Sequence, residues 1–313
     1  MPLTCILQTP SSRTRIDSTQ APDQDWETIH RVKPRPLLAC PECGGTMHAK
    51  ASKVGLRFFA HDHANDDCHL NGETPQHRYL KSVLAQIIRS HVGWVATLEA
   101  APTDRDHGGW RADVLATAPG GRRRIAFEVQ LASMPASVGV ERTRLYKQDG
   151  IEAIWLSDLR LPSWLGHVPA VVLNHKRGQL SAIPAENLRV AYGVVAWEGG
   201  ELVWLEEDFP RHKAPLLSDV IVGLLDKQYK PRQLHGVTVL ASSGRALCTQ
   251  RAFLETVCRK AIMAEPCPLH GSPPAMRTLR RAAGLAAWGW DEGRFWKDAQ
   301  KDADSRRLAP RNW

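Results

Sequence analysis

The sequence has no run of about eighteen consecutive apolar residues, the length that a helix needs to cross a bilayer. It also lacks a basic leader followed by an apolar stretch, since it opens with Met1-Pro-Leu-Thr-Cys-Ile-Leu-Gln8. We therefore expect a cytoplasmic protein with no membrane partner. With 313 residues, 43% of them hydrophobic, the chain can form two or three globular domains.

Acidic residues are in the minority, because 33 Asp and Glu face 41 Lys and Arg, which gives a formal charge of +8. The excess is uneven. Residues 1–72 hold 8 basic and 8 acidic side chains, whereas residues 227–281 hold 10 basic and 2 acidic ones. We expect a polyanionic partner to bind at residues 227–281, and the alternative is an ordinary solvated surface.

Cysteine is too scarce for a disulfide framework, since the seven cysteines are odd in number and two stand in Cys40-Pro-Glu-Cys43. Cys-x-x-Cys followed by glycines in a reducing compartment is typical of a metal site. With further ligands after Phe58-Phe59-Ala60, one ion would have four ligands and no open position, which predicts a structural zinc. The predicted ligands are Cys40, Cys43, His61 and Cys68, with His63 and His69 as alternatives for the third and fourth places.

Two segments that alternate apolar and polar residues flank the turn residues Pro119-Gly120-Gly121. The segments are residues 110–117 and 122–130, and their period of two predicts a β-hairpin. Asp113 and Glu128 would then project from adjacent strands toward one spot. Two converging carboxylates form a hard-oxygen site that suits Mg²⁺ or Mn²⁺.

Apolar residues spaced as on one helical face predict a helix over residues 73–91. Glu73, His77 and Lys81 form a second, polar stripe on it, and such a stripe is usually solvated. Further elements are expected as a strand over 94–99, a helix over 135–147 and a buried strand over 151–156. Helix, three strands, helix, strand is the αβββαβ order of the restriction-endonuclease-like fold.

Asp113, fourteen intervening residues and then Glu128-x-Gln130 resembles the core motif of PD-(D/E)xK nucleases, in the variant with Gln where most members have Lys. More narrowly, the chain resembles the CoiA-like family of competence proteins. The blocks that carry this resemblance are Glu73-Thr-Pro-Gln-His77-Arg-Tyr-Leu-Lys81, Glu141-Arg-Thr-x-x-Tyr146, Gly150-Ile-x-x-Ile-Trp-Leu156 and the preceding Cys-x-x-Cys with Phe-Ala-His.

The resemblance implies a nuclease whose first helix carries Glu73 into the active site, with His77 and Lys81 beside it. Asp113 and Glu128, with the carbonyl of Val129, would hold one or two Mg²⁺ ions. Gln130 can form hydrogen bonds but cannot supply the positive charge of the usual Lys, so Lys81 or His77 would compensate. The implied catalytic set is Asp113, Glu128, Gln130, Glu73, His77 and Lys81.

The predicted fold is α/β, with a restriction-endonuclease-like core at residues 73–160. A short edge strand at residues 4–9, a mobile loop and the zinc knuckle precede it within residues 1–72. An α+β region follows at 161–313, with a hairpin over 190–205 and an amphipathic helix over 216–229. Within this region Cys258, Cys267 and His270 could form a partial metal site, but core thiols are the better explanation of these cysteines. The tryptophans of the final residues either pack inward or stack on bases; they are Trp288, Trp290, Trp296 and Trp313.

Taken together, these features predict a Mg²⁺- or Mn²⁺-dependent DNA nuclease in DNA uptake, recombination or defence against foreign DNA. DNA-processing proteins are expected as further partners. One alternative is a zinc-containing DNA-binding accessory protein that keeps the fold without cleaving. Another is a core of ordinary salt bridges, in which Arg111 neutralises Asp113. The intact Asp113 and Glu128 pair favours the nuclease, because a non-cleaving protein has little reason to keep it.

Overall fold

The computed structural model describes residues 2–53, 55–63, 68, 70, 73–102, 109–159, 162–173, 175, 178–192, 194–198, 201–203, 215–234 and 237–242. It is a mixed α/β structure that divides into two compact units. The first unit comprises Met1–Leu131, Arg142–Asp158 and His175–Ala185, and the second takes the other described residues. The three predicted regions, divided at residues 72 and 160, stay a prediction.

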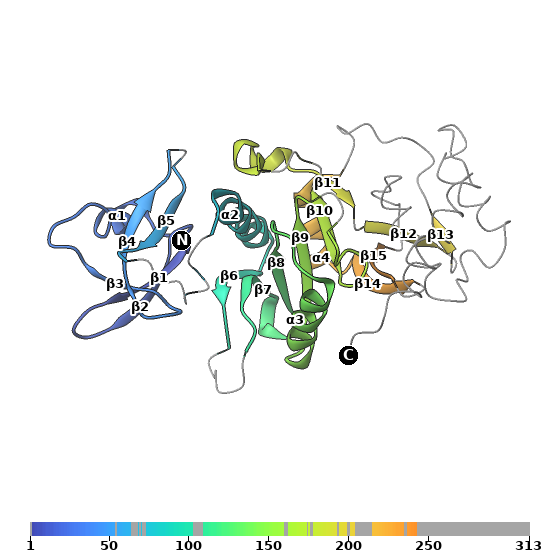
Figure 1. Ribbon diagram of the computed structural model, residues 1–313, viewed down its shortest axis with the longest axis horizontal. Helices are drawn as coiled ribbons and strands as arrows, with labels where there is room; N and C mark the ends of the chain where they lie inside the picture. Colours follow the sequence, from blue (N-terminus) through green and yellow to red (C-terminus); the bar gives the residue numbers. More distant parts are fainter. Residues whose placement is uncertain are drawn as a thin grey trace, which may run out of the picture. The chain divides into compact units, whose positions relative to one another are not determined.

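The first sheet of the first unit has five antiparallel strands in the order β2-β1-β3-β4-β5 (Figure 1). Its core includes Trp26, whose ring lies 5.6 Å from that of Phe59. The elements are β1 (Thr4–Gln8), β2 (Arg13–Asp17), α1 (Asp23–Glu27), β3 (Leu37–Ala39), β4 (Thr46–Ala51) and β5 (Arg57–His61).

The predicted strand at residues 4–9 is confirmed as β1, but its predicted place at the edge of the sheet and the predicted mobile loop are wrong. Strand β1 lies inside the sheet, between β2 and β3. The Ser/Thr-rich stretch forms a tight hairpin, because the Thr9 side chain accepts a hydrogen bond from the Ser12 amide at 3.0 Å. Ile16 and Trp26 then pack on the core of the sheet, which the low overall hydrophobicity of the segment concealed.

A second group of elements has the predicted order of helix, three strands, helix, strand, and all of it belongs to the first unit except the start of α3, up to Glu141. Strands β6 to β8 form antiparallel pairs, and β8 pairs with β9 in parallel across the connection through α3. The bounds are α2 (Pro75–Ser90), β6 (Val95–Ala100), β7 (Ala112–Thr117), η1 (Pro119–Gly121), β8 (Arg124–Val129), α3 (Ala136–Gln148), β9 (Ile151–Ser157) and η2 (Leu180–Ala182).

Helix α2 begins where the sequence provides a cap. The Thr74 side chain accepts a hydrogen bond from the His77 amide at 3.2 Å, and Pro75 occupies the first turn, where its missing N–H costs nothing. The apolar stripe that includes Leu80, Leu84 and Ile88 is fully buried. The helix lies against β6, β7 and β8, so this stripe fixes the polar residues of α2 relative to the sheet.

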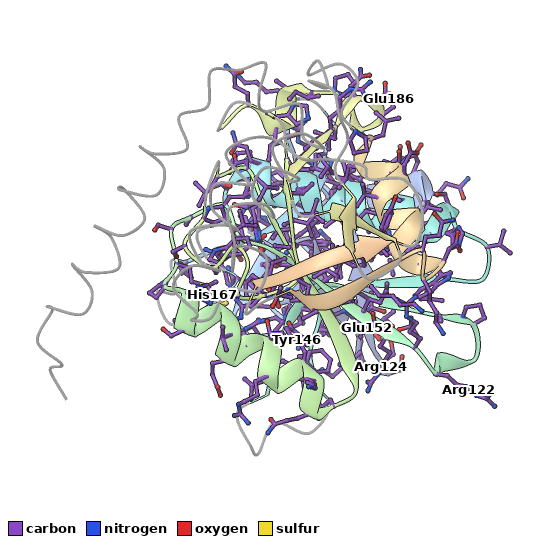
Figure 2. All side chains as sticks on the ribbon, turned by 90° about the vertical axis from the view of Figure 1, so that its right-hand side faces the viewer. Arg122, Arg124, Tyr146, Glu152, His167 and Glu186 are labelled. Atoms are coloured by element: carbon purple, nitrogen blue, oxygen red, sulfur yellow. The ribbon has the colours of Figure 1, made fainter. Side chains whose placement is uncertain are left out.

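The predicted hairpin is formed by β7 and β8. Val114 stands opposite Phe127, and both side chains are fully buried. Because strand side chains alternate between faces, Leu115 and Ala126 point to the other face, where they pack with Tyr146 of α3. Figure 2 shows Tyr146 on the side of α3 that faces the strands.

The six-stranded sheet has the order β11-β10-β9-β8-β7-β6, so β10 and β11 continue the sheet that begins with β6. A separate four-stranded sheet has the order β13-β12-β15-β14, and α4 is the helix described among the later residues. The predicted hairpin over 190–205 is confirmed in part, as the antiparallel pair of β12 and β13, whereas Val190–Tyr192 forms β11 and pairs with β10. The bounds are β10 (Ala170–Leu173), η3 (Ala185–Asn187), β11 (Val190–Tyr192), β12 (Val194–Glu198), β13 (Glu201–Val203), α4 (Leu217–Leu225), β14 (Tyr229–Leu234) and β15 (Val237–Ser242).

Several predictions fall outside the described residues. They concern His69, the partial metal set of Cys258, Cys267 and His270, the tryptophans from Trp288 onward and residues 243–281 of the basic segment. Across the part of the chain that the structure describes, no helix has both the length and the apolar character to span a membrane.

Candidate active site and candidate metal centre

Lys81 is the most deeply buried charged group of the candidate active site, with no exposed surface. Its ammonium donates hydrogen bonds to Glu73 at 2.7 Å and Glu99 at 2.8 Å, and Asp113 Oδ1 lies 3.9 Å away. Burial alone would lower the pKa of Lys81, but the charges of Glu99, Glu73 and Asp113 outweigh it and raise that pKa. Lys81 is therefore a fixed positive charge inside the protein.

Asp113 lies where β7 meets the end of β8. Its Oδ2 accepts a hydrogen bond from the Val129 amide at 2.8 Å, and His77 Nε2 lies 3.3 Å from the same oxygen. The same ring nitrogen lies 2.8 Å from the carbonyl oxygen of Val129. The imidazole of His77 thus stands between Asp113 and the Val129 carbonyl, the two oxygen groups at this strand end.

Opposite charges in this cluster stabilise one another. Burial lowers the pKa of His77, but Asp113 and Glu73 more than reverse this and raise it to about 10. Burial likewise raises the pKa of Asp113, and the charge of His77 and its hydrogen bond, with Lys81 next, bring it well below its usual value. An imidazolium at His77 and a carboxylate at Asp113 follow at neutral pH.

Glu73 precedes α2 and completes this cluster. Lys81, followed by His77, lowers the pKa of Glu73 to about 2 against the effect of burial. Ligand atoms of Glu73, His77 and Asp113 all lie within 4.8 Å of one another. Glu73 Oε2 is buried, and no described residue forms a hydrogen bond with it. An unpartnered carboxylate oxygen beside Asp113 fits a hard divalent cation such as Mg²⁺.

Glu128 has different partners from Asp113. Its carboxylate accepts hydrogen bonds from Arg142 Nη2 at 2.5 Å and from the hydroxyl of Tyr146, both on α3. Burial raises the pKa of Glu128 to about 7 in spite of the Arg142 charge. The cluster with metal-ligand spacing contains Glu73, His77 and Asp113 but not Glu128. A metal role for Glu128 stays a prediction.

Gln130 follows the end of β8, and its main chain holds it there. Its amide donates to the Leu156 carbonyl at 2.8 Å, and its own carbonyl accepts from Ser157 Oγ at 2.7 Å. These bonds extend the pairing of β8 with β9 by one residue. The catalytic role that the resemblance implies for the Gln130 side chain stays a prediction.

The four predicted zinc ligands converge, although 28 positions separate the first from the last. The ligand atoms of Cys40, Cys43, His61 and Cys68 all lie within 4.8 Å of one another. Cys40 Sγ and Cys68 Sγ are 3.7 Å apart, and Cys43 Sγ and His61 Nε2 are 3.4 Å apart. His63, an alternative ligand, is not among them. Three thiols and one imidazole at this spacing could bind zinc.

The loop around the thiols is a tight turn with glycines at two positions. The Gly44 amide donates to the Cys40 carbonyl at 3.0 Å, and Gly44 has a φ of +72°, which favours glycine. A Cβ at Gly45 would lie 3.3 Å from Cys43 Sγ and 3.6 Å from His61 Cδ2. Burial raises the pKa of the Cys40 thiol to about 12 in the metal-free protein. A bound cation would favour the thiolates instead.

Glu99 is a buried site residue that the sequence analysis missed. Its carboxylate accepts bonds from Lys81, from the Leu3 and Thr4 amides and from Thr4 Oγ1. The available signal was a charged residue at the end of an otherwise apolar β6. The expected alternative pair of Arg111 with Asp113 is wrong, because Arg111 pairs with Glu42 of the cysteine loop. Asp113 is neutralised from α2.

Residues 73–164 match the model of the family described as "Competence protein CoiA, nuclease-like domain". This segment is therefore similar to the CoiA nuclease-like domain. The predicted resemblance is thus confirmed over these residues, which include α2, the β7–β8 hairpin and the whole Glu73, His77, Lys81 and Asp113 cluster. The match covers less than half of the chain.

Similarity outside this family is sparse. The structure of SfsA from Pyrococcus furiosus in complex with Ca²⁺ shares 13% sequence identity with the chain, with a TM-score of 0.22. The match covers 55% of this chain and 92% of SfsA. No curated protein matches the chain.

Proposed function

We propose that the chain is a metal-dependent DNA nuclease with a restriction-endonuclease-like core. The observation that carries this proposal is the convergence of Glu73, His77 and Asp113 around the Val129 carbonyl, with buried Lys81 beside them. The match of residues 73–164 to a nuclease-like domain supports it. DNA is the proposed partner, in uptake, recombination or defence against foreign DNA.

The proposed ligands of a catalytic Mg²⁺ or Mn²⁺ are Asp113 and Glu128 with the Val129 carbonyl, and Glu73 offers a further carboxylate oxygen within 4.8 Å of Asp113. When bound, such an ion would stabilise charge on the phosphoryl oxygens and acidify a water molecule. The Val129 amide orients Asp113 through its hydrogen bond. Lys81 adds the positive charge that Gln130 cannot supply, and three carboxylates keep it in place.

His77 supplies a proton at this site. Its charged ring donates toward the Val129 carbonyl and toward Asp113, both groups that a cation would engage. In the metal-free protein His77 therefore neutralises Asp113. It also keeps a proton at Nε2 within reach of the oxygen atoms gathered there.

A second candidate function is a DNA-binding accessory protein that holds zinc and does not cleave. The specific observation in its favour is that Arg142 and Tyr146 already occupy the carboxylate of Glu128. Gln130 in place of the usual Lys points in the same direction. In both proposals a structural zinc is held by Cys40, Cys43, His61 and Cys68.

The test is a cleavage assay with single-stranded, duplex and branched DNA in the presence of Mg²⁺ or Mn²⁺. Asp113→Asn keeps an acceptor for the Val129 amide but removes the charge, so we expect cleavage to fall by at least about 100-fold. Gln130→Ala should cost less, because it removes a hydrogen bond rather than a ligand. Glu152→Gln, at the partly exposed ion pair with Arg123, is the control. Undiminished cleavage by folded Asp113→Asn would rule out the proposed site.

A further inference from the structure

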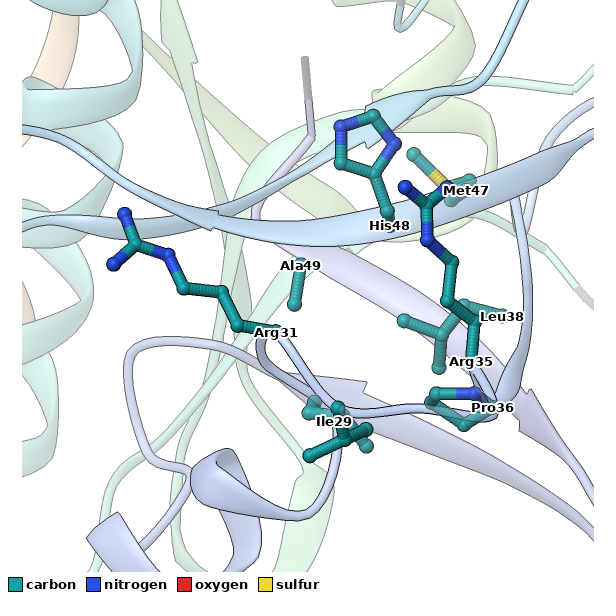
Figure 3. A pocket seen from close by; sticks show the side chains of 9 residues that line it. Ile29, Arg31, Arg35, Pro36, Leu38, Met47, His48 and Ala49 are labelled. Atoms are coloured by element: carbon teal, nitrogen blue, oxygen red, sulfur yellow. The ribbon is translucent and has the colours of Figure 1, made fainter.

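A cavity of about 110 Å³ lies on the first sheet, between β4 and the loop of residues 29–36 (Figure 3). Its floor includes Leu38, Met47 and Ala49, which are all buried apolar side chains. The three residues belong to paired strands β3 and β4, so the floor is part of the sheet and is rigid. A flat apolar group of modest size fits such a cavity better than an extended polar chain does.

The rim of the cavity is cationic. Arg31 and Arg35 line it from the loop, and His48 lines it from β4 (Figure 3). Residues 30–36 contain Arg31, Lys33 and Arg35 and no acidic residue. Within the described part of the chain, neither Arg31 nor Lys33 forms an ion pair, and both are exposed.

One acidic side chain, Asp62, borders this rim. Its Oδ1 lies 2.6 Å from His48 Nδ1 but 3.8 Å from Arg35 Nη1. The Arg35 side chain is 73% exposed, so this contact leaves its guanidinium available to a ligand. One carboxylate thus faces three permanent cations, and the loop keeps a net positive charge.

The backbone of the loop holds this arrangement at a cost. Arg31 has a φ of +62°, a conformation that non-glycine residues seldom adopt and that often marks a functional position. The pKa of the neighbouring His30 is lowered, first by burial and then by the positive charges of Arg31 and Arg57. A positive potential next to an apolar cavity is therefore built into the fold.

We infer that the cavity seats one unpaired base of single-stranded DNA while Arg31, Lys33 and Arg35 contact the adjacent phosphates. The flat, apolar face of a base matches the apolar floor, and the anionic phosphates match the cationic rim. A base inside a duplex is stacked and paired, so it cannot enter the cavity. The choice of DNA as the polyanion rests on the proposed function, whereas the single-strand preference rests on the cavity.

The charge part of this inference is tested with a triple variant, Arg31→Ala/Lys33→Ala/Arg35→Ala. Fluorescence anisotropy of a labelled single strand of about fifteen nucleotides measures affinity over a range of salt concentrations. Each lost phosphate contact lowers the salt slope by about 0.7, so we expect a slope smaller by about 2 and affinity reduced at least about ten-fold. The matched control is Arg13→Ala/Lys53→Ala/Arg122→Ala, which removes equal charge from exposed positions elsewhere.

The cavity part is tested by filling the cavity while the charges stay. Ala49→Met places a larger side chain on the floor and so fills the cavity. If that variant does not fold, Val32→Phe fills the cavity from the loop. We expect either variant to lose affinity for the single strand and to keep both its salt slope and its weaker affinity for a duplex. Equal losses in the two triple variants, or unchanged single-strand binding by a folded filled-cavity variant, would overturn the inference.

These measurements are made on the full chain without added Mg²⁺ or Mn²⁺, so no cleavage is involved. Cleavage that survives Asp113→Asn would end the proposed active site and leave the binding result intact. Conversely, a full loss of cleavage in Asp113→Asn with no effect of the loop variants would end only the inference. Vesicles with anionic lipids serve as a second probe, and binding to them that depends equally on the loop would also count against a base-binding cavity.

Discussion

Lys81 stays charged in the protein interior because carboxylates surround its ammonium on several sides. Removing any one of them leaves a buried cation with fewer partners, and such a loss is far more costly than the loss of a surface pair. Of these carboxylates, Glu99 connects most widely, because it also accepts hydrogen bonds from Leu3 and Thr4 at the start of β1. Its role is to position Lys81 and the N-terminal strand together.

We predict that Glu99→Gln lowers the free energy of unfolding by about 3–5 kcal/mol, measured by urea denaturation. The Glu99 carboxylate has two acceptor oxygens for its hydrogen-bond donors, whereas an amide has only one. The substitution also removes the negative charge that faces the Lys81 ammonium. Glu152→Gln is the control, because the ion pair of Glu152 with Arg123 is partly exposed and should be worth less than about 1 kcal/mol. Equal effects of the two substitutions would mean that the Glu99 carboxylate is not structurally special.

A second residue-level prediction concerns His77 and pH. Its pKa is raised from 6.5 to about 10 in the folded protein, so its charge stabilises the fold fully below pH 6.5. That contribution is lost as the pH rises from 6.5 through about 10. In this range the unfolded state has already released the proton, so holding it in the folded state becomes less favourable at each higher pH. Relative to His77→Gln, the natural protein should lose roughly 2–4 kcal/mol across this window.

The measurement is urea unfolding of the natural protein and of His77→Gln at several pH values between 6 and 10. His91→Gln, just beyond the end of α2, is the control for removal of a histidine as such. A constant difference in stability between the natural protein and His77→Gln over this range would contradict an imidazolium at this position.

At the scale of elements, the end of α2 and the turn between β7 and β8 fit together closely. Gly93 has a φ of +75°, and a Cβ there would lie 2.7 Å from Cγ of Pro119 in that turn. Gly120 within the turn has a φ of +72° but has no atom near the position of a Cβ. Both glycines have a positive φ that favours glycine, and only at Gly93 would a Cβ also collide with a neighbouring side chain.

We predict that Gly120→Ala costs about 1 kcal/mol of stability and that Gly93→Ala costs about 2 kcal/mol or more. The difference reflects displacement of Pro119, and with it the hairpin that carries Asp113. Thermal and urea unfolding measure both variants, and each serves as the other's control. Equal costs would mean that the turn moves away from α2 freely.

At the scale of the whole molecule, buried and partly buried polar contacts connect the first sheet to the nuclease-like elements within one compact unit. Glu99 bonds to the start of β1, and Arg111 next to β7 pairs with Glu42 between two of the cysteines. Loss of zinc from the cysteine cluster should therefore weaken the stability of the entire unit rather than act on one catalytic step.

We predict one tightly bound zinc per chain, to be measured by elemental analysis of gently purified protein. Cys43→Ala should lose this zinc and unfold at a lower temperature, since a structural zinc contributes folding energy directly. Cys5→Ala, a buried cysteine outside the cluster, is the control and should keep the zinc. A stable Cys43→Ala protein without zinc would show that the four ligands form an ordinary core.

Local patterns in the sequence were sufficient for these elements and for the resemblance of residues 73–164 to the CoiA nuclease-like domain. The period of two around Pro119-Gly120-Gly121 predicted β7 and β8, and the apolar stripe predicted α2, because each pattern reflects neighbours within one element. Cysteine spacing likewise predicted the four side chains that converge. The first 30 residues were misread, because the partners that bury β1 come from strands elsewhere in the chain.

The tertiary structure alone decided which charges meet. Glu128 lies in the predicted strand, yet its carboxylate turns to Arg142 and Tyr146, while Asp113 is met by His77 from α2. Glu99 joined the cluster through β1, a contact across 95 positions of sequence. Electrostatic partners are set by packing between distant elements, and burial then fixes their charge, so neither spacing nor composition could have specified them.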